Sequence, residues 1–136
     1  MLGPTLRPRR FATSPSSQIE YCCELTPKVD ALWLIPDPVV LDDEETIRLY
    51  FDMAHAANRP VFAYSAAFES LKPTLVLAPD MPTIGRQAAD IFQNLSTARD
   101  VYFPAGSEVI LNLGRVREYG LEFNRDSLDS VNRIIR

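Results

Sequence analysis

The sequence predicts an α/β fold in which helices cover a parallel sheet, and two observations support this prediction. Short apolar runs bounded by Pro, Gly or Asp alternate with segments whose apolar residues recur at helical spacing. The loops between these segments are short, which is typical of parallel strands joined by helices. We therefore expect a parallel sheet that is covered by helices and whose strands are buried on both faces.

Five apolar runs are predicted to be strands: Asp30–Ile35, Val61–Ser65, Thr74–Ala78, Val101–Phe103 and Glu108–Leu113. Pro36 ends the first run, Pro60 precedes the second and Pro79 ends the third. Proline suits strand boundaries because it has no backbone N–H to donate to a neighbouring strand. Trp33 lies inside the first run, so we expect it to pack in the core.

Four segments are predicted to be helices: Asp43–Ala57, Thr83–Leu95, Arg115–Tyr119 and Ser127–Ile135. Asp42 with Glu45 is expected to cap the first, and Asp126 the last. Gly120 is expected to end the third. Gly85 lies inside the second, where glycine costs ~1 kcal/mol relative to alanine. This cost favours close packing at that position, and a glycine that is merely tolerated is the alternative.

The composition is that of one globular domain, and it excludes several classes of protein. The chain has 136 residues, of which 46% are hydrophobic and 24% charged, with a net charge of −4. Beyond Arg7, Arg9 and Arg10 the basic residues do not cluster, so nucleic acid is not an expected partner. The apolar runs are too short for a membrane-spanning helix. The adjacent cysteines Cys22 and Cys23 are expected to be reduced thiols.

The first 18 residues differ in composition from the rest. They contain three Pro, three Arg and three Ser without apolar periodicity. We expect residues 1–18 to be a disordered lead-in and residues 19–136 to form the α/β lobe. No secretory signal is visible there, because no apolar stretch follows the arginines.

A polar residue follows each of three predicted strands, which makes Asp37, Ser65 and Asp80 the candidate binding residues. Ligands of open α/β sheets bind beyond the carboxyl ends of the strands. Local structural roles are the alternative: a turn at Asp37, a loop start at Ser65 and a helix cap at Asp80. The sequence contains no phosphate-binding glycine loop and no nucleophile elbow, and no metal site or cofactor is predicted.

Five segments in a set order resemble the carboxyl-terminal half of ABC-importer substrate-binding proteins of the TrpX-like family. They are Asp30–Asp37 (DALWLIPD), Pro60–Ser65 (PVFAYS), Leu77–Asp90 (LAPDMPTIGRQAAD), Gly106–Leu113 (GSEVILNL) and Glu118–Leu121 (EYGL). The similarity extends over roughly Val29 to Leu121. It implies one lobe of a type I periplasmic-binding-protein fold.

The resemblance also implies a function without catalysis. A small ligand, often an aromatic amino acid in this family, binds between two lobes that close by a hinge. The loaded protein then delivers its ligand to an ABC permease, which implies a periplasmic or extracytoplasmic location. Asp37, Ser65 and Asp80 match cleft-facing loop positions. An aspartate there suits a ligand ammonium and the serine a ligand carboxylate.

The chain departs from the family pattern in ways that leave other functions open. Members of the family are about twice as long, and the lobe that precedes this region is not in the sequence. The segment matching Thr74–Leu95 normally packs on that lobe, so its helix is expected to be without a partner here. This predicts a homodimer, a swapped assembly or poor solubility. The alternatives to solute binding are a ligand-free dimerising lobe and a small enzyme that uses Asp37 and Asp80 with Mg²⁺.

Overall fold

The computed structural model of the chain describes residues 15–97, 99 and 101–136. Four α-helices are present in this part: α1 (Pro15–Leu25), α2 (Glu44–Ala56), α3 (Met81–Gln93) and α4 (Leu113–Glu118). The strands are β1 (Leu32–Trp33), β2 (Val61–Ala63), β3 (Leu75–Pro79), β4 (Ser107–Asn112) and β5 (Arg133–Ile135). Short 3-10 helices complete the described part: η1 (Thr26–Lys28), η2 (Ala66–Leu71), η3 (Leu95–Thr97) and η4 (Arg125–Ser130).

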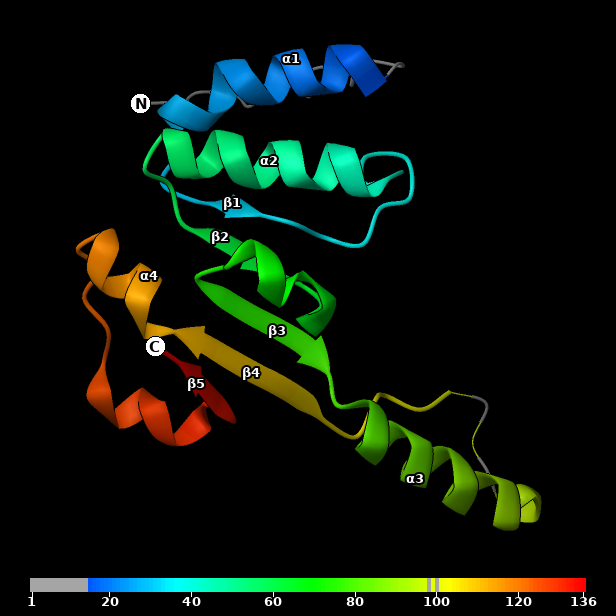
Figure 1. Ribbon diagram of the computed structural model, residues 1–136. Helices are drawn as coiled ribbons and strands as arrows, with labels where there is room; N and C mark the ends of the chain where they lie inside the picture. The colour runs from blue at the N-terminus through cyan, green and yellow to red at the C-terminus, as the bar shows by residue number, and fades with distance from the viewer. Residues whose placement is uncertain (1–14, 98, 100) are drawn as a thin grey trace, which may run out of the picture.

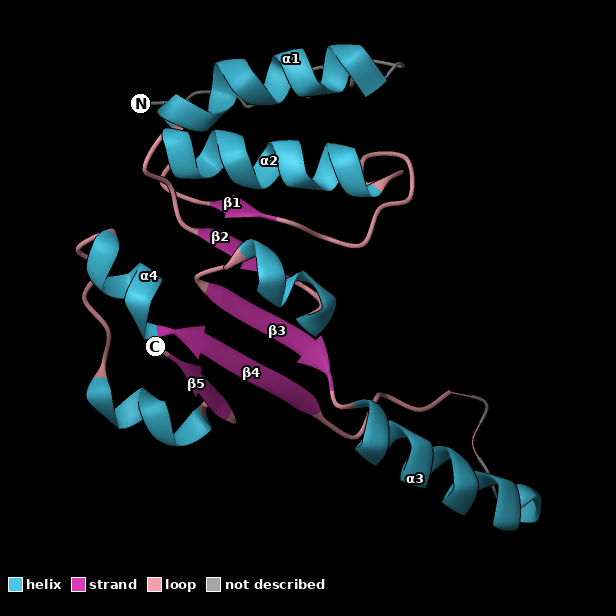
Figure 2. Cartoon of the chain, viewed as in Figure 1, coloured by secondary structure: helices cyan, strands magenta, loops and turns pink. Residues whose placement is uncertain are grey.

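The strands form one five-stranded sheet in the order β1-β2-β3-β4-β5 (Figures 1 and 2). β1, β2 and β3 are parallel to one another, and β5 is parallel to β4. β3 and β4 are antiparallel, with Pro79 opposite Ser107. The predicted α/β class is confirmed, with a mostly parallel sheet. The antiparallel pair arises because the chain leaves the sheet after β3 and returns beside it.

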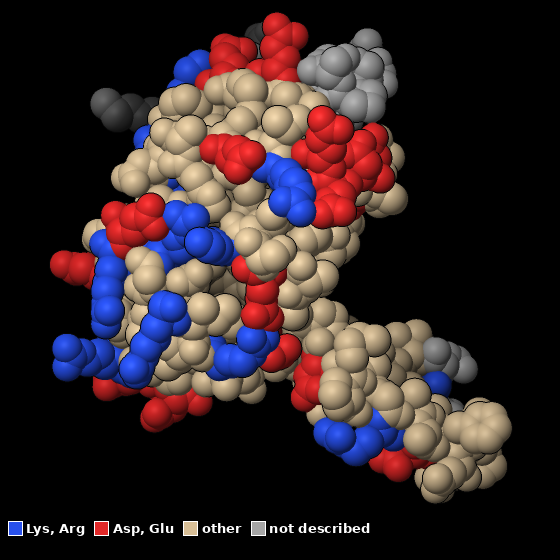
Figure 3. Space-filling model, viewed as in Figure 1, with Lys and Arg blue, Asp and Glu red and all other residues tan. Residues whose placement is uncertain are grey.

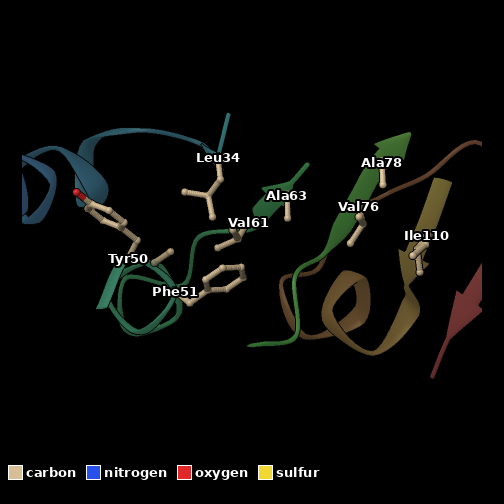
Figure 4. Packing of buried hydrophobic residues seen from close by; sticks show 9 residues of the cluster. Leu34, Tyr50, Phe51, Val61, Ala63, Val76, Ala78 and Ile110 are labelled. Atoms are coloured by element: carbon tan, nitrogen blue, oxygen red, sulfur yellow. The ribbon is translucent and has the colours of Figure 1, made fainter. Parts of the chain in front are cut away.

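The core lies on one face of the sheet. Side chains on this face alternate with those on the other because successive strand residues point in opposite directions. The buried set joins strand residues to residues of α2: Leu34, Tyr50, Phe51, Ala54, Val61, Ala63, Val76, Ala78 and Ile110. In Figure 4 the side chains of Val61, Val76 and Ile110 point to the same side of the sheet.

The opposite face carries an apolar row that crosses all five strands. The strand registers pair Trp33 with Phe62, Phe62 with Leu75, Leu75 with Leu111, and Leu111 with Ile134. Within this row Trp33 is 65% exposed and Ile134 is 42% exposed. The expectation that both faces are buried and that Trp33 packs in the core was therefore wrong.

Several sequence-based predictions of local structure also require correction. Val101–Phe103 is not a strand. Ser127–Ile135 is not a helix: η4 occupies its first part, and Arg133–Ile135 pairs with the free edge of β4. The cap of α2 is Asp43, whose carboxylate accepts from the Thr46 amide at 2.7 Å, and not Asp42.

The first helix, α1, was not predicted, because its sequence PSSQIEYCCEL has only a weak apolar pattern. It begins at Pro15, so residues 15–18 are helical and do not belong to a disordered lead-in. The prediction for residues 1–14 falls outside the described part. α1 packs on α2, where Ile19 and Cys22 contact the core cluster.

α3 projects away from the rest of the molecule (Figure 1). None of its residues is buried. The segment that returns to β4 is tied to α3 through Gln87, which donates to the Phe103 carbonyl and accepts from the Ala105 amide, at 2.9 and 3.0 Å. At the base, the Asp80 amide donates to the Gly106 carbonyl at 3.1 Å. The expectation that this helix has no partner in the chain is confirmed for the described residues.

The one-sided core can be tested with one substitution made on each face. Ile110→Val removes a methylene from a side chain that is 1% exposed, and it should lower the free energy of unfolding by about 1 kcal/mol. Ile134→Val makes the same change on the open face and should cost less than about 0.5 kcal/mol. Urea unfolding of both variants measures the difference. Equal costs would show that both faces are buried in solution.

His55 on α2 makes stability depend on pH. Its ring contacts Phe51 edge-on, and its Nδ1 lies 3.4 Å from a guanidinium nitrogen of Arg115 on α4. Burial, followed by the Arg115 and Lys72 charges, lowers the pKa of His55 below its ordinary value of 6.5, against the opposing charges of Glu118 and Asp52. In the window between these two pKa values the unfolded chain therefore binds more protons than the folded one.

We expect the free energy of unfolding to fall as the pH drops from about 7.5 to 5.5, because protonation of His55 favours the unfolded chain. His55→Gln keeps an acceptor for Arg115 and should reduce this loss. The measurement is urea unfolding of both proteins at the two pH values. A variant with the same pH dependence as the original chain would contradict the assignment to His55.

Candidate functional site

The three candidate residues follow the carboxyl ends of β1, β2 and β3, which meet at one edge of the sheet because these strands are parallel. The structure places Asp37 in the loop that leaves β1, Ser65 directly before η2, and Asp80 directly before α3. The edge is therefore shared, as predicted. Each side chain also has a local hydrogen-bonding role.

Asp37 organises the loop between β1 and α2. Its Oδ1 accepts from the backbone amides of Val39 and Val40, at 2.9 and 3.4 Å. Its own carbonyl accepts from the Leu41 amide at 2.9 Å. This is a turn in which the aspartate side chain stands in for a backbone carbonyl.

Ser65 begins the short helix η2. Its Oγ accepts from the Ala67 amide at 3.2 Å, while its backbone is extended. The hydroxyl thereby satisfies an amide at the start of η2 that has no partner within that helix. The side chain is half-buried.

Asp80 caps α3 with both oxygens of its carboxylate. Oδ1 accepts from the Thr83 amide at 3.1 Å, and Oδ2 accepts from the Thr83 hydroxyl at 2.6 Å. These two bonds, with a smaller contribution from the Arg86 charge, hold the pKa of Asp80 below its usual range, so the carboxylate stays ionised. Gly106 lies against it, since a Cβ at that position would be 3.2 Å from the Cβ of Asp80.

A hollow of about 510 Å³ lies between the loop that leaves β1 and the helix η2 that leaves β2. Acidic residues at the start of α2 line one side, and the apolar residues of η2 line another. The lining residues are Leu41, Asp42, Asp43, Glu44, Ile47, Ala67, Phe68, Ser70 and Leu71. Acidic side chains gather over the start of α2 (Figure 3). The size is within the range of small-molecule sites.

Sequence reasoning missed this hollow because it did not predict η2. The acidic residues were explained by the dipole of the helix they begin, which accounts for Asp43 as the cap but not for the apolar wall opposite. Phe68 in that wall contacts Tyr64 edge-on, with ring centroids 5.2 Å apart. Asp37 and Ser65 shape the two loops that form the hollow without being among its lining residues.

The described residues contain no group of three or more His, Cys, Asp or Glu side chains placed to hold a metal ion. They also contain no helix that is both long and apolar enough to cross a membrane.

Comparison with known proteins gives matches to solved structures. No protein-family model matches the chain, and no curated protein matches it. A conserved domain protein from Vibrio cholerae O1 biovar El Tor has a TM-score of 0.65 and 20% identity, over 90% of this chain and 42% of that one. The ABC domain from Streptococcus pneumoniae in complex with L-Trp has a TM-score of 0.63 and 17% identity, over 91% and 44%.

These matches confirm the fold class: the chain has an α/β fold that resembles part of each of these two structures. It spans less than half the length of each of the two solved structures.

Asp43 both lines the hollow and caps α2, so its structural role can be measured separately. Asp43→Ala removes the acceptor of the Thr46 amide and should lower the free energy of unfolding by about 1 kcal/mol. Asp43→Asn keeps an acceptor oxygen and should change it by less than about 0.5 kcal/mol. Urea unfolding at neutral pH measures both variants. Similar losses in the two variants would show that the charge, and not the cap, is what stabilises α2.

Proposed function

We propose that the chain is a solute-binding lobe of an ABC-importer substrate-binding protein and binds a small solute such as an amino acid without chemistry. The observation that carries this proposal is the 510 Å³ hollow at the carboxyl edge of the sheet, which combines carboxylates with an apolar wall. The likeness in fold to a structure that holds L-Trp supports the same class of ligand.

The lining of the hollow suits an amino acid with a large apolar side chain. Carboxylates at Asp42 and Glu44 offer acceptors for a ligand ammonium, although Glu44 also pairs with Arg48 at 2.7 Å. Phe68 and Leu71 offer an apolar surface for the side chain. The hollow is open to solvent on this lobe, and we propose that a second lobe provides the facing wall and closes by a hinge.

Asp37, Ser65 and Asp80 are proposed to act at the same edge, with their local hydrogen bonds fixing the loops that meet the ligand. Asp80 is ionised and thus remains an acceptor for a cationic group. The proposal further includes an ABC permease as partner and an extracytoplasmic location. It includes no catalytic step and no cofactor.

A ligand-free dimerising lobe is the second candidate function, and the projecting helix α3 favours it. The two candidates differ in what stabilises the fold. A solute-binding lobe gains stability from its ligand, whereas a dimerising lobe gains it only from protein concentration.

The first test is a thermal-unfolding screen of the full chain with L-Trp, L-Phe, L-Tyr and other amino acids. A ligand at 100 times its dissociation constant should stabilise the fold by ~2.7 kcal/mol, which is a shift of several degrees. Asp42→Asn should abolish the shift by removing from the hollow a negative charge that pairs with the ligand ammonium. Asp52→Asn makes the same change on α2 outside the hollow and should leave the shift intact. The absence of any shift in the well-folded chain would contradict solute binding by this lobe alone.

A further inference from the structure

The projecting part of the chain carries most of the large apolar side chains that are more than half exposed. We call residues 80–105 the arm; it consists of α3 and the segment that returns to β4. Within its described residues five large apolar side chains are more than half exposed: Met81 (68%), Phe92 (74%), Leu95 (62%), Val101 (74%) and Phe103 (89%). Among the described residues, α3 makes no substantial contact with any other helix or strand. An isolated helix with this much exposed apolar surface is typical of an interaction site.

One face of α3 is entirely apolar. Met81, Gly85, Ala88, Phe92 and Leu95 follow one another at intervals of four and three residues, which places them on a single stripe along the helix and its continuation. We call these five residues the stripe. Arg86 and Asp90 lie on the opposite side of the helix, since each residue adds about 100° of rotation. The stripe therefore contains no charge.

Gly85 in the middle of the stripe is not explained by the chain itself. A Cβ at this position would meet nothing within 4 Å. Its helical backbone is one that any residue adopts, so no positive φ requires glycine. Glycine is also among the poorest helix formers. A glycine on an exposed apolar stripe lets a second helix, or a large side chain carried by it, approach closely.

We propose that the stripe binds the same stripe of a second copy of this chain, with the two α3 helices antiparallel about a two-fold axis near Ala88. In that arrangement Ala88 meets Ala88 at the axis, and Phe92 of each copy lies over Gly85 of the other. Met81 then faces Leu95 at both ends. Phe92 thus fills the space left at Gly85, and Met81 packs against Leu95. The surface is therefore complementary to itself, as a two-fold interface requires.

The size and the charge of the surface agree with this occupant. The exposed parts of Met81, Phe92 and Leu95 amount to roughly 400 Å² per chain, which suits a weak, concentration-dependent dimer. The chain has a net charge of −4, so two copies repel each other wherever acidic groups face. The outer end of the arm is largely free of charged side chains in Figure 3, in contrast to the start of α2.

This interface is separate from the proposed ligand site. The hollow lies between the β1 loop and η2, and none of its lining residues belongs to the arm. Dimer formation and ligand binding can therefore fail independently, and the thermal-unfolding screen and the test below report on different residues.

The test is the mass of the full chain in solution, measured by sedimentation over a range of concentrations. We expect a dimer. Phe92→Glu should raise its dissociation constant by about tenfold or more, because a charge would then face Gly85. Gly85→Leu should do the same by filling the gap, although leucine is the better helix former and leaves the monomer folded. Asp90→Ala, on the opposite side of α3, is the control and should have no effect.

The orientation is tested by crosslinking. In a chain whose native cysteines are replaced by Cys22→Ser and Cys23→Ser, Ala88→Cys should form a disulfide-linked dimer on mild oxidation, since this residue lies at the axis. Asp90→Cys in the same background should not. A chain that is monomeric at all concentrations would overturn the proposal and assign the arm to a different lobe. A dimer that survives both stripe substitutions and is lost in Trp33→Glu would also overturn the proposal. It would show that two copies bind through the exposed sheet face that carries Trp33.

Discussion

The packing of α2 against one face of the sheet is the contact on which the rest of the structure depends. Ala54 and Val61 are fully buried at this seam, and Phe51 is 1% exposed. The seam joins β1, α2 and β2 into one unit, which fixes where the loop after β1 ends and where α2 begins. The hollow between that loop and η2 exists because its acidic wall is the first turn of the anchored helix.

The predictable parts of this fold are those in which local pattern and packing agree. The spacing of Ile47, Tyr50, Phe51 and Ala54 predicts α2, and these residues do face the core. The runs after Pro60 and before Pro79 predict β2 and β3. The residues after Ser127 misled the prediction because a segment as short as Arg133–Ile135 can close either a helix or a strand. These residues form the strand β5 because they pair with the free edge of β4, and the sequence alone does not show that this edge is free.

The candidate site likewise combines features that the sequence predicts with features that it does not predict. The positions of Asp37, Ser65 and Asp80 at one sheet edge follow from the parallel order of three strands. Their hydrogen bonds to Val39, Ala67 and Thr83 depend on loop conformations that single residues do not reveal. The hollow was missed because its apolar wall is carried by a 3-10 helix, whose short length leaves no periodic pattern. The open sheet face was missed because these strands carry apolar residues on both faces, which is the pattern expected of strands buried on both sides.

The way the arm joins the sheet has a consequence for how this chain can change. The chain leaves the sheet for the arm at Pro79 and returns to the sheet at Ser107, and these two residues are paired neighbours on adjacent antiparallel strands. A connection between such neighbours needs only a tight hairpin turn, so the sheet does not require the intervening residues for its own geometry. The arm is thus a topological insertion. It can be exchanged, lengthened or removed in evolution or by design without altering the register of the five strands that hold it.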